Sequence, residues 1–204
     1  MFQAHAALFL YATSPVHMGA GQAFGLIDNP IARERHCEHP VFPGSGLKGA
    51  IRHRFHTLPN WTEGEKGEKL LDRLFGPESQ AGTLHAGAIS LGDAQLVALP
   101  VRSVKQGYVY ATSAHALARA ARLLTQLGVT GMPATPTTLA AGQTCVGNAE
   151  LLSGDRLHLE AFEYINTSAQ SDALKAVAQW LAENALPTGD AHAYFRDKFA
   201  RDLV

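Results

Sequence analysis

The residues best suited to chemistry lie in a glycine-punctuated segment, 14–21, and at the carboxylate of Asp28 that follows it. Gly19, Gly21 and Gly25 can leave their backbone amides uncovered, so that a phosphate group can approach the chain closely. Glycine-rich turns are usually only turns, and the pattern alone is a weak indication. An aspartate before Asn-Pro often bonds its own backbone, but as a free carboxylate Asp28 could ligate a divalent metal such as Mg²⁺.

A basic helix start follows in the segment 43–52. Turn residues lead there into an apolar-periodic stretch, which predicts a helix over about 45–57 with Ser45 as its N-cap. Lys48 lies in the first turn, where its ammonium group opposes the helix dipole. A bound phosphate would explain this placement, because the free amides, the dipole and the ammonium group would then face one anion. We therefore expect Ser45, Lys48 and Arg52 to contact an RNA backbone.

The positive charge of this region is local. Five Arg and Lys residues lie against two Glu residues over 33–56, whereas the whole chain carries a formal net charge of −1. This balance counts against a bulk electrostatic binder, so any RNA contact must depend on the local patch. Arg33 and Arg35 are divided between RNA contact and pairing with Glu34 or Glu38, and the pattern does not order these alternatives.

Histidine and cysteine offer other chemistry. His17 could act as a general base without metal, or it could hydrogen-bond the loop that it anchors. Four more histidines lie in the basic region, and without a Cys or acidic partner at zinc-like spacing we interpret them as surface residues. They are His36, His39, His53 and His56. Cys37 and Cys145 match no usual ligand spacing, and we expect reduced thiols in a cytoplasmic protein.

Three linked motifs resemble the signature of the RAMP superfamily of CRISPR effector proteins, most closely the branch that forms the backbone (fourth Cmr) subunit of type III-B complexes. The motifs are SPVHMGAG at 14–21, IDNPIARER at 27–35 and PGSGLKGAIR at 43–52. The resemblance implies that Asp28 is the catalytic carboxylate of a divalent-metal-dependent endoribonuclease. The implied partners are a CRISPR guide RNA, a paired target RNA, copies of the same chain and other Cmr subunits, with no membrane.

The resemblance leaves three functional hypotheses. The first is a metal-dependent nuclease that cuts target RNA with Asp28. The second is a non-catalytic scaffold for guide RNA, and the third is a metal-independent processing nuclease that uses His17. Family members normally continue past the residue that matches Val204 into a β-hairpin and a closing segment, so we expect this sequence to be a shortened form.

The elements that must position these residues follow a mixed order. The apolar share of 46% and the charged share of 17% are ordinary for a globular protein. Alternation of apolar residues predicts strands, and apolar residues at helical spacing predict helices. The expected strands span 2–13, 88–91, 94–97 and 107–111, with a further pair, 145–151 and 156–164, across a turn at 153–155. The expected helices span 45–57, 63–75, 171–184 and 190–203, with another that Ser113 caps.

This order predicts an α+β fold, namely a ferredoxin-like (RRM-like) βαββαβ core with helical insertions. We expect a single RNA-binding domain over 1–204, with insertions at about 58–85 and 113–140 and a helical segment at about 169–204. Tyr108 and Tyr110 alternate on one expected strand, where core filling is a better interpretation than base stacking. Sequence-independent contact with the RNA backbone is then the simpler mode of binding.

Overall fold

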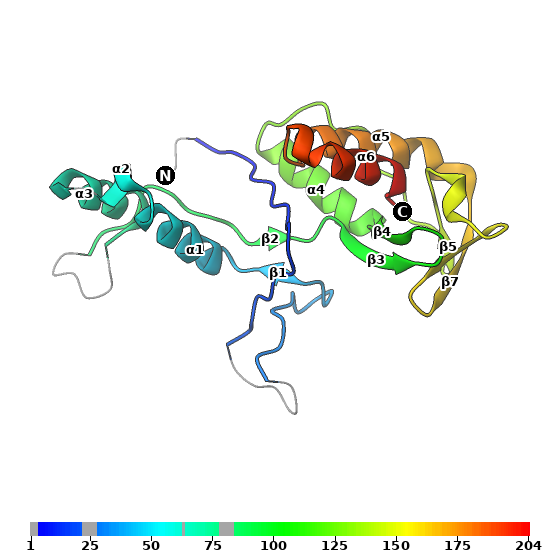
Figure 1. Cartoon of the computed structure of the whole chain (residues 1–204), viewed down its shortest axis with the longest axis horizontal. Helices are drawn as coiled ribbons and strands as arrows, with labels where there is room; N and C mark the ends of the chain where they lie inside the picture. The colour runs from blue at the N-terminus through cyan, green and yellow to red at the C-terminus, as the bar shows by residue number, and fades with distance from the viewer. Residues whose placement is uncertain (1–3, 22–27, 63, 78–83) are drawn as a thin grey trace. The chain divides into compact units, whose positions relative to one another are not determined.

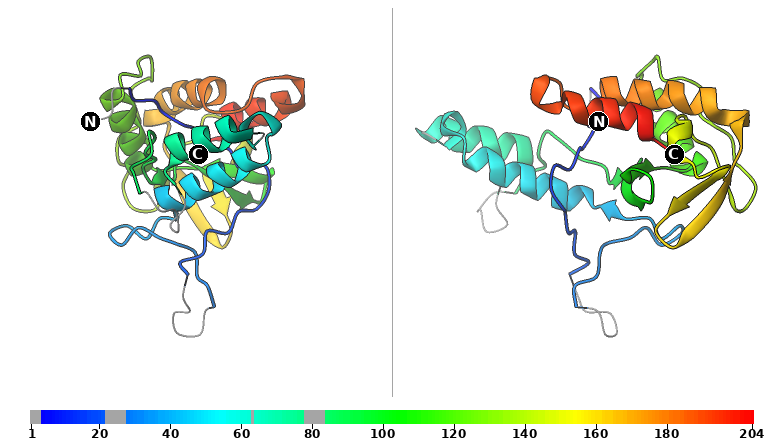
Figure 2. Two further views of the ribbon diagram at one scale, coloured as in Figure 1. Left: turned by 90° about the vertical axis from the view of Figure 1, so that its left-hand side faces the viewer. Right: turned by 45° about the vertical axis from the view of Figure 1, so that its right-hand side comes forward.

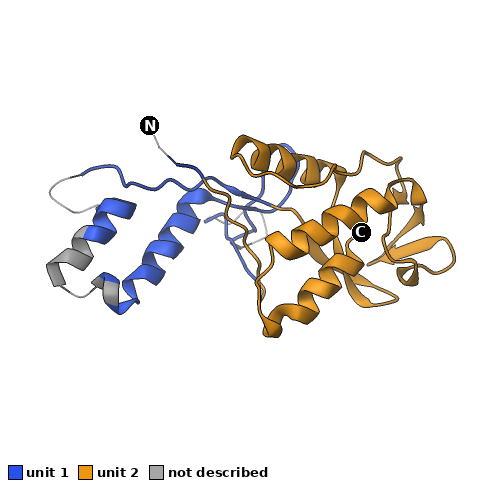
Figure 3. Ribbon diagram, turned by 90° about the horizontal axis from the view of Figure 1, so that it is seen from above, with its two compact units in different colours: residues 1–5, 16–95 blue, residues 6–15, 96–204 orange. Residues whose placement is uncertain are grey.

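The computed structural model describes residues 4–21, 28–62, 64–77 and 84–204. The chain divides into two compact units, which Figure 3 shows in different colours. Unit 1 comprises residues 1–5 and 16–95, and unit 2 comprises residues 6–15 and 96–204. Among the described residues, we find no helix with the length and apolar character needed to cross a membrane.

Unit 1 contains a two-stranded sheet and a group of three helices (Figure 1). Strand β1 (Val41–Phe42) pairs antiparallel with β2 (Ala94–Gln95). The helices are α1 (Gly44–His56), α2 (Pro59–Thr62) and α3 (Gly64–Phe75). The Phe55 ring packs edge-on against Trp61 and Phe75, with ring centroids 4.6 and 5.5 Å away. These aromatic contacts join the three helices.

Unit 2 contains a five-stranded sheet of order β4-β3-β6-β7-β5 and three helices. The strands are β3 (Leu99–Ser103), β4 (Gly107–Ala111), β5 (Gln143–Thr144), β6 (Arg156–Leu159) and β7 (Phe162–Asn166). Strand β5 is parallel to β7, and the other pairs are antiparallel. Helices α4 (Ala114–Gln126), α5 (Ser171–Asn184) and α6 (Ala193–Asp202) lie on one side of this sheet in both Figure 1 and Figure 2.

Alternation along β4 divides the core of unit 2 into two clusters. Tyr110 packs against Phe199 of α6, with ring centroids 4.8 Å apart, in a cluster that also contains Leu117 of α4. The preceding residue, Val109, belongs to a second cluster with Leu157. Because neighbouring strand residues point to opposite faces, one strand serves both clusters. The interpretation of Tyr110 as a core-filling residue is confirmed.

Several predicted elements agree with the structure. Strand β4 and helix α5 have the predicted bounds, and Ser113 caps α4 by accepting a hydrogen bond from the Ala116 amide at 3.1 Å. Helix α3 ends before Gly76, whose φ of +88° is the left-handed conformation that commonly terminates a helix. The mixed α+β class is therefore confirmed, and the ferredoxin-like order of the strands stays a prediction.

The predicted strands at 2–13 and 88–91 are wrong for the residues that the structure describes. Residues 4–13 form no strand in the described part of the chain, and Phe9 instead packs edge-on against Trp180 of α5, with ring centroids 6.3 Å apart. Residues 88–91 also form no strand, because the amide of Ala88 donates to the Arg73 carbonyl at the end of α3. Apolar alternation was present in both segments, but neither has a neighbouring strand to pair with in the described residues.

The predicted strand pair across 153–155 is also wrong. Residues Ala149–Leu151 form a 3-10 turn, and the side chain of Asn148 caps it by accepting a hydrogen bond from the Glu150 amide. The segment 156–164 instead bends back on itself at Glu160, which has a φ of +51° and lies between β6 and β7. Strand β3 was missed because Pro100 within it argues against a strand from sequence alone.

Candidate functional site

Asn29 organises the loop that carries the expected catalytic residues. Its backbone carbonyl accepts a hydrogen bond from His17 Nε2 at 2.9 Å, and its Oδ1 accepts one from the Gly21 amide at 3.2 Å. Gly19 lies against the same side chain, since a Cβ atom on Gly19 would be only 2.0 Å from Asn29 Oδ1. The φ of Asn29 is +45°, a conformation that Asn tolerates better than most residues. Three residues of the 14–21 motif therefore converge on Asn29.

Backbone hydrogen bonds join the two arms of this loop. The amide of Ala20 donates to the Pro30 carbonyl at 2.8 Å, and the amide of Ala32 donates to the Met18 carbonyl at 2.7 Å. The segments 18–20 and 30–32 therefore run antiparallel, as the bridge between Gly19 and residue 31 also shows. The sequence-predicted Gly25 lies outside the described residues.

Asp28 is exposed at the end of this loop. Among the described residues its carboxylate has no hydrogen-bond or ion-pair partner, and an aspartate that bonds its own backbone stays an alternative. The side chain of Asn29 bonds the backbone of Gly21. Mg²⁺ retains several waters and is commonly held by one or two carboxylates together with substrate phosphates. An exposed, uncommitted carboxylate fits such an ion.

His17 is committed to the loop through one ring nitrogen. A carbonyl can only accept a hydrogen bond, so Nε2 of His17 must carry a proton where it meets Asn29. The basic nitrogen of the neutral ring is then Nδ1. The anchoring role that the sequence left open is present in the structure, and a role as general base stays a prediction.

Helix α1 begins at Gly44 with Pro43 as its N-cap, so the prediction that Ser45 is the N-cap is wrong. The Gly44 amide donates to Oδ1 of Asp93 at 2.7 Å. This contact depends on the absence of a side chain, because a Cβ on Gly44 would lie 2.2 Å from the carbonyl oxygen of Leu91. A distant segment therefore packs against the helix start and supplies the cap in place of Ser45.

Ser45 and Gly46 are exposed in the first turn of α1. The amides of a helix's first turn have no partner within the helix, so these two positions can still offer donors to an anion. A Cβ on Gly46 would lie 3.0 Å from the Met18 Cε atom. The loop that carries His17 and Gly19 therefore meets the start of α1, and Lys48 lies half-buried in that helix. The first and third motifs are brought together in unit 1.

Two of the predicted RNA-binding arginines hold the protein itself together. Arg52 forms an ion pair with Asp72 at 3.1 Å and donates to the Gly76 carbonyl, and its side chain is only 19% exposed. This arginine therefore fastens α1 to the end of α3. Arg33 donates to the backbone carbonyl of Glu38 at 2.7 Å, whereas Arg35 is exposed. RNA contact by these arginines stays a prediction.

Sequence reasoning missed two residues of the site, Asn29 and Asp93. The Asp-Asn-Pro sequence held a signal for Asn29, since Asn is enriched at left-handed turn positions. Asp93 lies 49 residues from Gly44 along the chain, and no local pattern links them.

Comparison with known proteins places this geometry in a family. A family model described as the RAMP superfamily matches residues 9–189. The chain is 32% identical over 200 residues to the CRISPR system Cmr endoribonuclease Cmr4 of Pyrococcus furiosus, covering 96% of this chain and 65% of that protein. It is 29% identical over 86 residues to the CRISPR system Cms endoribonuclease Csm3 of Enterococcus italicus, covering 39% of this chain and 40% of that protein.

The fold agrees with these sequence matches. The crystal structure of oligomeric Cmr4 from Pyrococcus furiosus matches with a TM-score of 0.72 and 27% identity, over 95% of this chain and 65% of that chain. The chain thus spans just under two thirds of the length of these Cmr4 relatives, which agrees with the expectation of longer family members. From its motifs, its fold and these matches, the chain belongs to the RAMP superfamily.

Proposed function

We propose that this chain is the backbone subunit of a type III-B CRISPR effector complex that binds guide RNA and cleaves the paired target RNA. Its partners in this proposal are the two RNAs, further copies of itself and other Cmr subunits. The named activity of the relatives, endoribonuclease, supports the proposal. The proposal also includes a ferredoxin-like core, which would serve as the scaffold of the RNA-binding loop.

The exposed carboxylate of Asp28 is the observation that carries this function. Asn29 supplies the hydrogen bonds that shape the loop, and Asp28 contributes none in the described structure. An exposed charged side chain without a partner among the described residues, next to a stabilised loop, is available to a ligand. We therefore assign the chemistry to Asp28 and the positioning to Asn29.

The same geometry supports contact with RNA phosphates. Gly19 and Gly21 lie exposed beside His17, but the Gly21 amide already donates to Asn29. The first turn of α1 presents the exposed Ser45 and Gly46 next to that loop. Helix starts and glycine turns bind anions through backbone amides, which read no base sequence. Such a surface suits a subunit that must accept any guide. Lys48 adds a cation on the same helix.

Asp28 would hold a divalent ion together with phosphate oxygens and water. When bound, such an ion screens phosphate charge and lowers the pKa of the attacking hydroxyl, here a ribose 2′-hydroxyl of the target. The task of the chain is to keep the carboxylate beside the scissile linkage and to splay the target backbone for in-line attack. Attachment of His17 to Asn29 keeps the loop in place during this step.

Cleavage and binding by the assembled complex test this function. We would measure both for wild type, Asp28→Asn and His17→Ala, in Mg²⁺ and after its removal with EDTA. Asp28→Asn should leave target affinity unchanged and slow cleavage by about 100-fold or more, since loss of metal catalysis costs several kcal/mol of barrier. Asp155→Asn is the matched control, because it removes an exposed carboxylate in unit 2.

The alternatives predict different results. A guide-RNA scaffold without catalytic activity would bind RNA and show no cleavage with any variant. A metal-independent nuclease would cut in EDTA and would lose activity in His17→Ala. Full cleavage by Asp28→Asn in Mg²⁺ would remove Asp28 from the chemistry.

A further inference from the structure

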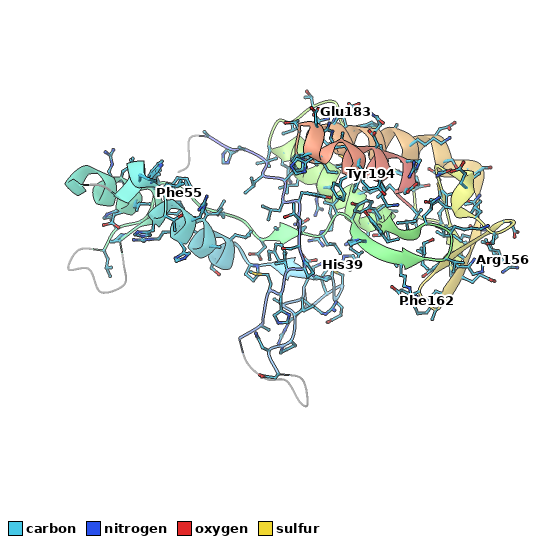
Figure 4. All side chains as sticks on the ribbon, viewed as in Figure 1. His39, Phe55, Arg156, Phe162, Glu183 and Tyr194 are labelled. Carbon is cyan, nitrogen blue, oxygen red and sulfur yellow. The ribbon has the colours of Figure 1, made fainter. Side chains whose placement is uncertain are left out.

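A second group of metal-ligating side chains lies on the tight turn over residues 34–39. A carboxylate oxygen of Glu34, the sulfur of Cys37 and a ring nitrogen of His39 all lie within 4.8 Å of one another. Cys37 Sγ donates a hydrogen bond to Glu34 Oε2 at 3.1 Å. All three residues are half-buried, and Figure 4 labels His39 on this part of unit 1. The sequence suggested a surface histidine at position 39, and the structure places His39 half-buried beside Cys37 and Glu34.

The backbone of the turn holds these residues in register. The Glu34 amide donates to the His39 carbonyl, and the Glu38 amide donates to the Glu34 carbonyl, each at 2.9 Å. Arg33 and Pro40 form an antiparallel bridge just outside the turn. Glu38 has a φ of +58°, which lets the chain reverse between the second and third ligand. These contacts fix the positions of the three Cα atoms. Only side-chain rotation is then needed to bring the ligand atoms onto one ion.

The ligand separations suit a tetrahedral ion. With a metal–sulfur distance of about 2.3 Å and metal–oxygen or metal–nitrogen distances of about 2.1 Å, tetrahedral angles place the ligand atoms about 3.6 Å apart. Cys37 Sγ and Glu34 Oε2 are already 3.1 Å apart, and the third atom lies within 4.8 Å of both. Small side-chain rotations would complete the geometry. On binding, the ion would replace the thiol proton between sulfur and oxygen, and that proton would leave to solvent.

We propose that Glu34, Cys37 and His39 form a structural Zn²⁺ site. Sulfur and imidazole nitrogen are ligands that zinc prefers, whereas Mg²⁺ takes oxygen ligands, so this site is chemically distinct from the one proposed at Asp28. One thiolate and one carboxylate neutralise the two charges of the ion. A water molecule would take the fourth position of the tetrahedral ion.

The site would stabilise the hairpin that supports the RNA-binding loop. The turn connects the segment 30–33, which pairs with 18–20, to the segment 40–41, whose Val41 amide donates to the Ala32 carbonyl at 3.0 Å. Zinc would cross-link both ends of this turn, and it would therefore fix the segment 30–33, which follows Asp28. Its role is to hold the loop in place, and it takes no part in the cleavage step.

Cobalt substitution tests the site on the purified, tag-free chain. Co²⁺ bound by a thiolate in a tetrahedral site gives a sulfur-to-cobalt charge-transfer band and strong visible absorption. We expect one equivalent of Co²⁺ to produce both signals and one equivalent of Zn²⁺ to abolish them. Cys37→Ser should remove the charge-transfer band, and Cys145→Ser, which alters a buried cysteine of unit 2, should leave it intact.

Two further variants retain the thiol and protect the test against misfolding. Glu34→Gln and His39→Gln should each weaken Co²⁺ affinity by at least about tenfold, which is the lower end of the cost of losing even a supporting residue at a metal site. Circular dichroism checks that each variant is folded. Absence of the charge-transfer band in wild type, or its persistence in Cys37→Ser, would overturn the proposal.

The two metal proposals can fail separately. EDTA strips both ions, but Mg²⁺ added back restores only the site at Asp28. If zinc stabilises the turn, Cys37→Ser should lose Zn²⁺-dependent protection of residues 34–39 from hydrogen exchange, while Asp28→Asn should retain it. Unchanged exchange of this turn on addition of Zn²⁺ to wild type would contradict the structural role.

Discussion

Substitution of two glycines in α1 gives opposite changes in stability. Gly49 is exposed in the helix interior, and a Cβ there meets no atom within 4 Å. Gly49→Ala should therefore raise the free energy of unfolding by about 1 kcal/mol, the difference in helix propensity between the two residues. Gly44→Ala would instead place its Cβ 2.2 Å from the Leu91 carbonyl oxygen and 2.9 Å from the carbonyl carbon of Gly92.

The cost of Gly44→Ala follows from the contacts that must move. Backbone atoms cannot rotate away, so the segment that holds Asp93 must withdraw from the helix start. Loss of the cap costs about 1 kcal/mol and the overpacking about 2 kcal/mol, which gives a loss of about 3 kcal/mol. The two alanine variants should then differ by about 4 kcal/mol, although the chemical change is the same.

Tryptophan fluorescence can follow unit 1 alone. The chain has two tryptophans, and in a Trp180→Phe background the remaining one, Trp61, packs against Phe55 of α1. Urea unfolding of Gly44→Ala and Gly49→Ala in that background reports the stability of the helical group. A Gly44→Ala variant as stable as the parent would refute the close packing at the helix start and the role of Asp93 as its cap.

Three further outcomes are expected. Lys48→Ala should weaken RNA binding about equally across sequences and lower the salt slope of affinity by about one, as titrations at several salt concentrations would show; a sequence-selective loss would argue against a phosphate contact. Burial alone would raise the pKa of Asp202, but hydrogen bonds from Arg201, Lys198 and Asn148 hold it below its usual value. In urea unfolding, this stabilisation of unit 2 should be complete above about pH 4, where the carboxyl of the unfolded chain titrates. It should be lost as the pH falls from there toward the pKa of the folded state, and a urea midpoint that does not change with pH in this range would contradict the prediction. Asn29→Ala should slow target cleavage more than Asn29→Gly, since only glycine accepts the positive φ without strain, and equal losses would exclude a role for that conformation.

The sequence by itself determined the features that depend on neighbours a few residues apart. Ser113 and the apolar spacing that follows it predicted α4, and the periodicity over 171–184 predicted α5 with its observed bounds. The three motifs predicted the family, and the resemblance that they carry singled out Asp28. Helix caps, turns and amphipathic faces are local properties, so they can be read along the chain.

Tertiary structure alone decided which residues do the structural work. Asn29 meets His17 across 12 residues and Asp93 meets Gly44 across 49, and only folding brings such pairs together. Pairing of segments likewise decided that residues 4–13 are no strand in the described structure, since a strand requires a partner as well as a pattern. The turn that gathers Glu34, Cys37 and His39 depends on a backbone reversal, because spacing along the sequence does not report the directions in which side chains point.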